Sequence, residues 1–166
     1  MHVRPYQTGD EAALYQVYYS AIHKIAVRDY TAEQIEAWAP KAFDLAVWAE
    51  RMHTIRPFVA EVDGRIAGYA DVQPSGYIDH FYVSGDFPRQ GVGRRLMDHL
   101  HTEAQGLALT ELTSDVSRTA QAFFAHFDFQ IVEQRFPVRR GVMIPNARMR
   151  KALPVVSAAS TQLLPI

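Results

Sequence analysis

Hydrophobic positions follow a helical spacing in the first third of the chain. Apolar residues recur every three to four positions across residues 13–25, and shorter stretches of the same kind follow at 31–38 and 44–52. Residues 8–11 and 31–34 have the capping-box pattern, in which a threonine and a Glu or Gln three positions later satisfy each other's backbone amides. This pattern predicts three helical pieces.

A strand-like period replaces the helical spacing from residue 58 onward. Residues 58–62 and 65–72 flank Asp63-Gly64, the sequence of a tight hairpin turn. Residues 77–83 read as one strand, which places His80 and Tyr82 on one face and Asp79 on the other. The other predicted elements are a first strand at 3–6, helices at 91–108 and 118–126, a strand at 110–116 and a closing hairpin of 131–138 with 142–150. Antiparallel strands followed by strand–helix–strand indicate an α+β fold with a mixed sheet.

The composition is that of an ordinary globular protein of 166 residues, with 48% hydrophobic and 21% charged residues. The net charge of -1 argues against a general nucleic-acid binder. The absence of cysteine excludes disulfides, a thiolate metal site and a cysteine nucleophile. The N-terminus carries no long apolar run, so we expect no signal peptide or membrane anchor and a cytoplasmic location. We expect one domain over residues 1–151 and a C-terminal tail at 152–166.

Two glycines and three arginines mark the segment 86–97, DFPRQGVGRRLM, where a loop becomes a helix. A Walker loop would need a lysine after its last glycine, and a dinucleotide-binding turn would need a third glycine where this chain has Leu96. Two interpretations remain. Backbone amides at the start of the helix cradle a pyrophosphate, helped by the arginines, or the segment is an ordinary helix start with a solvated basic turn.

Two motifs in order resemble the signatures of the GNAT superfamily of acyl-CoA-dependent N-acyltransferases. Segment 77–100, YIDHFYVSGDFPRQGVGRRLMDHL, is similar to its motif A, a strand and a loop followed by [Q/R]-x-x-G-x-[G/A] at a helix start. Segment 117–129, SRTAQAFFAHFDF, resembles its second signature, S-x-x-A-x-x-F-[Y/F]-x-x-x-G-F. The early segment DYTAEQIEAWAP, residues 29–40, is similar to the YafP-like branch of acetyltransferases. The chain departs from the family at Pro88, where Gln or Arg is usual, and at Asp128, which replaces a glycine and can take the left-handed conformation.

The resemblance implies the GNAT fold, a twisted, mixed, mostly antiparallel sheet of about seven strands flanked by about four helices. It also implies acetyl-CoA as co-substrate, bound where neighbouring strands splay after Val83. The pantetheine arm would pair with the strand backbone as an added strand does. The pyrophosphate would lie on the loop of segment 86–97 that contains Gly91 and Gly93, termed the glycine loop. The residues implied for the cofactor are Phe81, Tyr82, Val83, Arg89, Gln90, Gly91, Val92, Gly93, Arg94 and Phe124.

Amine acylation by a thioester needs a base, because a free amine is mostly protonated at neutral pH. Asp79 and His80 are the candidate bases on the central strand, and each is equally well explained as a structural partner of a neighbouring helix. Proximity supplies much of the rate in this chemistry, so a dedicated base is not required. A backbone N–H around Tyr82 or Val83 is the expected oxyanion donor.

The family often places a tyrosine, as the acid for the departing thiolate, where this chain has Phe124. Tyr82 and His126 are the substitutes to test. Alternatively no acid is needed, because a thiol with a pKa of about 8.5 leaves readily.

The first two helices cap the acceptor pocket in the family fold, so Tyr30 and Trp38 are candidate substrate-binding walls, with core packing as the alternative. No HxxxH pair occurs, and we expect no metal. The predicted function is acetyl transfer from acetyl-CoA to a primary amine, of a small molecule, by direct attack in a ternary complex. A non-catalytic acyl-CoA-binding or regulatory module and a protein or peptide N-acetyltransferase remain as alternatives, and the sequence leaves a homodimer open.

Overall fold

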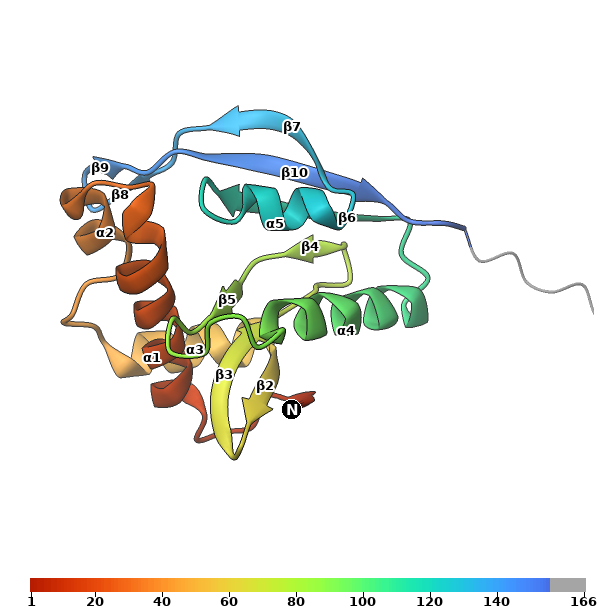
Figure 1. The fold of residues 1–166 in the computed structure, drawn as a ribbon, viewed down its shortest axis with the longest axis horizontal. Helices are drawn as coiled ribbons and strands as arrows, with labels where there is room; N and C mark the ends of the chain where they lie inside the picture. The colour runs from red at the N-terminus through yellow and green to blue at the C-terminus, as the bar shows by residue number, and fades with distance from the viewer. Residues whose placement is uncertain (156–166) are drawn as a thin grey trace, which may run out of the picture.

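The computed structural model of the chain describes residues 1–155 (Figure 1). The helices are α1 (Glu11–Ser20), the π-helix η1 (Ala21–Ile25), the 3-10 helix η2 (Ala26–Arg28), α2 (Ala32–Trp38), α3 (Leu45–Ile55), α4 (Val92–Gly106) and α5 (Gln121–His126). The strands are β1 (His2–Pro5), β2 (Phe58–Val62), β3 (Arg65–Ala70), β4 (Tyr77–Ile78), β5 (Phe81–Val83), β6 (Glu111–Ser117), β7 (Gln130–Arg135), β8 (Val138–Arg139), β9 (Val142–Met143) and β10 (Asn146–Ala152).

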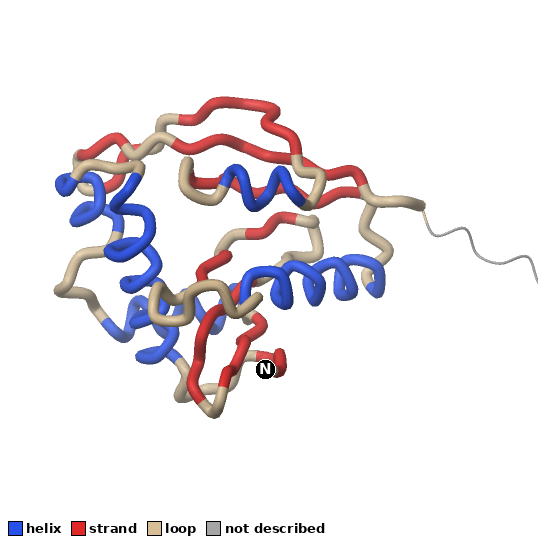
Figure 2. Tube along the Cα trace, in the orientation of Figure 1, coloured by secondary structure: helices blue, strands red, loops and turns tan. Residues whose placement is uncertain are grey.

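The main strands form two four-stranded sheets instead of one continuous sheet. The first has the order β1-β2-β3-β5 and antiparallel pairing. The second has the order β4-β6-β10-β7, in which β4 and β6 run parallel and the other pairs antiparallel. Figures 1 and 2 show β7 and β10 at one end of the molecule, β2 and β3 at the other, and the short β4 and β5 between them. The predicted α+β class with mixed, mostly antiparallel pairing is confirmed.

The predicted strand 77–83 is broken in two, which is the main difference from the sequence-based prediction. β4 pairs with β6, whereas β5 pairs with β3. The fully buried carboxylate of Asp71 accepts hydrogen bonds from the backbone N–H groups of Asp79 (3.2 Å) and His80 (2.6 Å). These bonds satisfy the two amides at the break without a neighbouring strand, so the chain can pass from one sheet to the other.

Two hydrophobic cores lie on opposite faces of the first sheet. Val59 and Tyr69 belong to the core formed with α1, α2 and α3, whereas Ala60 and Ala70 belong to the core formed with α4. Successive strand residues point to opposite faces, so the early helices cover one face of the sheet and α4 covers the other.

The predicted helices are present, with differences at their ends. The capping box at residues 31–34 is confirmed at the start of α2. The one at residues 8–11 is wrong, because α1 begins after Asp10 and the Glu11 carboxylate accepts from Gly9 N–H (2.8 Å) instead of from Thr8. The predicted helix at 118–126 begins only at Gln121.

Gly68 in β3 permits the close approach of α4 to the first sheet. A Cβ at this position would lie 2.9 Å from Val92 Cγ1, 3.0 Å from Tyr82 O and 3.1 Å from Leu96 Cδ1. We therefore expect Gly68→Ala to lower the free energy of unfolding in urea by about 1–3 kcal/mol, the usual cost of an overpacked core. Gly106→Ala is the control, because an added Cβ there meets nothing within 4 Å. Equal stabilities of the two variants would contradict this account of Gly68.

The last described strand crosses the predicted end of the domain at residue 151. Ala152 pairs with Glu111, and Leu153 N–H donates to Thr110 O (2.8 Å). The remainder of the predicted tail, residues 156–166, lies outside the described residues. Within residues 1–155, none of the helices combines the length and the apolar character needed to cross a membrane.

Candidate active site

The break between β4 and β5 opens one edge of β5 toward β6. β4 still pairs with β6 at Ile78 and Ser114, but among the described strands β5 pairs with β3 alone. A strand edge without a partner presents a row of backbone N–H and C=O groups. The splay therefore begins at residues 79–80, before β5, and not after Val83 as predicted.

Hydrogen-bond alternation decides which backbone groups of β5 face this gap. Ser84 N–H donates to Ala67 O of β3 (2.8 Å), and every second residue of an antiparallel strand bonds to the same neighbour. The N–H groups of Phe81 and Val83 consequently point into the gap, where they can donate to a ligand. The backbone of Tyr82 faces β3, so of the two predicted oxyanion donors the N–H of Val83 lies in the gap and that of Tyr82 does not.

The glycine loop ends in an α4 N-terminus with unused amides. Gly91 has a φ of 75°, and an added Cβ there would meet nothing within 4 Å, so the left-handed backbone and not the available space requires glycine. Arg95 N–H donates to Gly91 O (3.0 Å) and begins the helical hydrogen bonds. The N–H groups of residues 92–94 lie ahead of it, at the positive end of the helix.

The end of α1 and η1 hold the loop that precedes these glycines. Lys24 forms an ion pair with Asp86, and the Ser20 hydroxyl accepts a hydrogen bond from Gly85 N–H (3.1 Å). The chain widens into a π-helix at residues 21–25, where the sequence predicted a regular helix. Such turns are rare and frequently occur at functional sites, and η1 lines the cavity beside the loop.

A cavity of about 460 Å³, termed the loop cavity, is lined by η1, β5, the glycine loop and the start of α5. Its walls include the predicted cofactor residues 81–83 and 89–94. Amides of a helix N-terminus and two arginines, Arg89 and Arg94, suit a pyrophosphate. The open edge of β5 suits the amides of a pantetheine arm. The residues present therefore fit an acyl-CoA.

Phe124 is the predicted cofactor residue that does not line the loop cavity. It is buried and lines a second cavity, whereas its neighbour Phe123 lines the loop cavity. Phe123 also restricts Gly93, because an added Cβ there would lie 3.2 Å from its ring. Of these two adjacent rings, Phe123 faces the loop cavity and Phe124 faces the second cavity.

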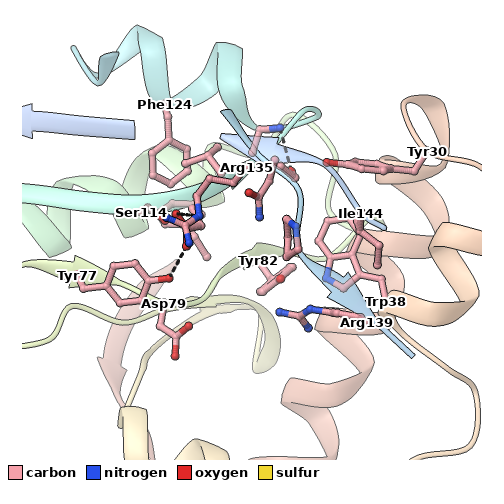
Figure 3. Close-up of a pocket in the computed structure, with 17 residues that line it drawn as sticks. Tyr30, Trp38, Tyr77, Asp79, Tyr82, Ser114, Phe124, Arg135, Arg139 and Ile144 are labelled. Carbon is pink, nitrogen blue, oxygen red and sulfur yellow. Dashed lines mark hydrogen bonds and ion pairs between the residues drawn. The ribbon is translucent and has the colours of Figure 1, made fainter. Parts of the chain in front are cut away.

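The second cavity, termed the Asp79 cavity, has a volume of about 190 Å³ (Figure 3). Residues of β4, β5, β6, α5, β7, β8 and β10 and of the segments next to them line it, together with Tyr30 and Trp38. Five residues line both cavities: Trp38, Phe81, Tyr82, Ser117 and Ala120. Two molecules, one in each cavity, would meet at this shared wall.

Tyr82 is one of the residues of the shared wall, and Figure 3 shows it between Asp79 and Trp38 in the Asp79 cavity. Its ring centroid is 4.8 Å from that of Tyr18 and 5.4 Å from that of His80. Burial raises the pKa of the Tyr82 hydroxyl to about 12, although the positive charge of Arg139 acts in the opposite direction. The hydroxyl is therefore protonated at neutral pH and can donate to an anion that forms beside it.

The structure separates the two candidate bases. His80 lines neither cavity, and its Nδ1 lies 3.0 Å from the Tyr69 hydroxyl. Burial, together with the charges of Arg51 and Arg139, lowers the pKa of His80 to about 3, so the ring is neutral and a weak proton acceptor. Asp79 lines the second cavity, and its carboxylate forms an ion pair with Arg51 of α3. His126, the other candidate acid, contacts Arg94 (3.3 Å) and lines neither cavity.

Tyr30 and Trp38, the two candidate substrate-binding residues, both line the Asp79 cavity. The Tyr30 hydroxyl donates to Pro145 O (2.6 Å) and accepts from Arg118 N–H (2.9 Å). Both of these hydrogen bonds join it to the backbone of the chain, so they are structural. Sequence reasoning missed three polar residues: Asp71 at the strand break, and Arg139 and Asn146 in the Asp79 cavity. Among residues 1–155, no group of three His, Asp or Glu side chains is arranged to hold a metal ion.

Comparisons with known proteins agree with a cleft built for an acyl-CoA. The family model described as Acetyltransferase (GNAT) domain matches residues 26–153. The chain is 31% identical over 150 residues to YafP of Escherichia coli (strain K12), named as an uncharacterized N-acetyltransferase, with 90% of this chain and 95% of that protein covered.

Solved structures show the same architecture. The structure of a GCN5-related N-acetyltransferase (aminotransferase, class II) from Rhodopseudomonas palustris is 31% identical, covers 92% of this chain and 95% of its own, and has a TM-score of 0.87. The structure of yncA from Salmonella typhimurium, an acetyltransferase with its cofactor acetyl-CoA, is 19% identical, has a TM-score of 0.67 and covers 97% of this chain and 98% of its own.

Fold and cleft together define an enzyme of the acyl-CoA-dependent acyltransferase class. The chain belongs to the GNAT acetyltransferase family and is an N-acetyltransferase that uses acetyl-CoA.

Proposed function

We propose that the protein transfers the acetyl group of acetyl-CoA to the primary amine of a small molecule, by direct attack in a ternary complex. The observation that carries this proposal is the wall shared by the two cavities. A thioester in the loop cavity and an amine in the Asp79 cavity would meet at Tyr82. The volume of the Asp79 cavity, about 190 Å³, favours a small acceptor over a folded protein segment.

Acetyl-CoA supplies the activated acetyl group, and residues of the chain bind and orient it. The amides of residues 92–94 and Arg89 hold the pyrophosphate. The N–H of Phe81 or Val83 donates to the carbonyl oxygen of the thioester, where negative charge develops during attack. These donors are fixed by the β3 pairing before the ligand arrives, which makes them effective in the transition state.

The proton transfers follow from the side chains at the shared wall. The amine nitrogen attacks the carbonyl carbon, the C–S bond breaks, and the thiolate takes a proton from the Tyr82 hydroxyl. The proton lost by the amine passes through water or Asp79 and restores Tyr82. Asp79 supports this step better than His80, because Asp79 lines the acceptor side and His80 lines neither cavity.

A panel of primary amines tests the proposal through the release of CoA thiol from acetyl-CoA. We expect release above the hydrolysis background with at least one small amine. Binding of acetyl-CoA without release by any small amine or peptide would favour the regulatory module, and release with peptides alone would favour a protein or peptide N-acetyltransferase. The cytoplasmic location and the homodimer stay predictions from the sequence.

Tyr82→Phe tests the assignment of the acid. Without the hydroxyl, we expect kcat to fall by about 10- to 100-fold, near the lower end of general acid catalysis because a thiolate is a good leaving group. The dissociation constant of acetyl-CoA should remain within about twofold, because the aromatic ring is retained. Tyr19→Phe is the control, since Tyr19 lines neither cavity. Unchanged kcat in Tyr82→Phe would remove Tyr82 from this role.

A further inference from the structure

Arg139 is the charged residue of the Asp79 cavity that has no hydrogen-bond or ion-pair partner among the described residues. The other charged residues of this cavity have partners: Asp79 with Arg51, Asp115 with Arg148 (2.9 Å) and Arg135 with Glu133 (3.2 Å). The cavity is therefore left with one uncompensated positive charge. A guanidinium in such a position suits an anionic group of a ligand, in particular a planar carboxylate.

The β8–β9 hairpin carries this arginine to the acceptor side of the site. Arg139 pairs with Val142 across a turn in which Arg140 and Gly141 have φ values of 49° and 76°. Figure 3 shows the Arg139 side chain reaching toward Tyr82 from the side of Trp38. Its charge acts against burial on the pKa of Tyr82 and together with burial on the pKa of His80, in keeping with this placement.

Asn146 supplies a second unsatisfied group in the same cavity. Its side-chain oxygen is buried and has no hydrogen-bond partner among the described residues. Asn146 stands opposite Ser117 in the β10–β6 pairing, and Ser117 lines both cavities. A buried carbonyl oxygen without a donor is unfavourable unless a ligand satisfies it, and an amine is such a donor.

From these two groups we infer that the acceptor is a short amino acid, whose carboxylate binds Arg139 and whose amine is oriented by Asn146 toward the shared wall. This inference rests on the proposed function, because it gives the chemical class of the amine. The limited volume of the cavity keeps carboxylate and amine within a few bonds of each other.

Matched pairs of acceptors test the charge directly. The kcat/KM values of several short amino acids are compared with those of the corresponding amino acid amides, which keep the amine and the size but lose the negative charge. We expect a preference of about tenfold or more for the acids in at least one pair. Arg139→Gln should remove this preference by raising KM for the acid, with little effect on the amide, and Arg139→Lys should restore part of it. Arg140→Gln, with the same change of charge, is the control, because Arg140 lies outside both cavities and bonds Ala37 O (2.7 Å).

The outcomes separate this inference from the proposed function. Acetylation of acids and amides at equal rates, or an equal loss for both in Arg139→Gln, would overturn the carboxylate site while leaving small-molecule acetylation in place. Acetylation of no amine in the panel would overturn the proposed function, and the inference with it.

Discussion

Replacement of Gly91 by glutamate is expected to lower the affinity for acetyl-CoA by about 100-fold or more. The new carboxylate would stand at the α4 N-terminus, where the pyrophosphate is expected, and two like charges about 4 Å apart repel by several kcal/mol near a protein surface. A non-glycine residue at the φ of 75° adds backbone strain. The dissociation constant measured by isothermal titration calorimetry is the readout.

Gly64→Glu is the matched control for this variant. Gly64 lies in the β2–β3 turn with a φ of 74°, and an added Cβ there also meets nothing within 4 Å. The strain and the change of net charge are therefore alike at the two positions, but Gly64 lines neither the loop cavity nor the Asp79 cavity. Retained affinity in Gly91→Glu, or an equal loss in both variants, would show that the loop does not bind the pyrophosphate.

Asp71→Ala is expected to lower the free energy of unfolding by about 3 kcal/mol, and to weaken acetyl-CoA binding as well. Removal of the carboxylate leaves the buried N–H groups of Asp79 and His80 without an acceptor, each at a cost of about 1–3 kcal/mol. The break that separates β5 from β6 then loses its support. Urea denaturation and calorimetric titration of acetyl-CoA measure the two effects. Asp71→Asn keeps one acceptor oxygen and should recover most of both; a stable Asp71→Ala with normal affinity would refute this role.

Asp71 also gives the stability a pH dependence of defined sign. Burial raises the pKa of its carboxyl from 3.8 to about 6. Between these values the folded protein holds a proton that the unfolded chain releases, so the contribution to stability is fully present below about pH 4 and is lost as the pH rises through about 6. The loss is about 3 kcal/mol. The difference between wild type and Asp71→Asn, measured across this range, should show that slope; a flat difference would contradict it.

The candidate acyl-CoA site could be outlined from the sequence because its parts are nearly contiguous. Residues 81–83 and 89–94 form one strand–loop–helix unit, in which glycine spacing and helix polarity determine the local structure. Asp128 likewise adopts the left-handed conformation expected of it, with a φ of 66°. The sequence could not show that Phe123 and Phe124 face different cavities, because that depends on how α5 packs against distant segments. The helix also starts three residues later than the pattern indicated.

The acceptor side depends on contacts between distant segments, which the pattern of residues along the chain does not reveal. The strand break is fixed by Asp71, which reaches Asp79 and His80 across a turn, so the run of alternating residues looked continuous. Arg139 and Asn146 enter the cavity from β8 and β10, where no motif marks them. The comparison of Asp79 with His80 also required the structure, because only the folded chain shows that Asp79 lines a cavity and His80 lines neither.

A crystal structure with bound acetyl-CoA tests the central claim most directly. The account predicts the pyrophosphate on the amides of residues 92–94, the pantetheine arm along the open edge of β5, and the thioester beside Tyr82 with its carbonyl oxygen near the N–H of Phe81 or Val83. Acetyl-CoA bound elsewhere, or a thioester that does not reach the wall between the two cavities, would contradict it.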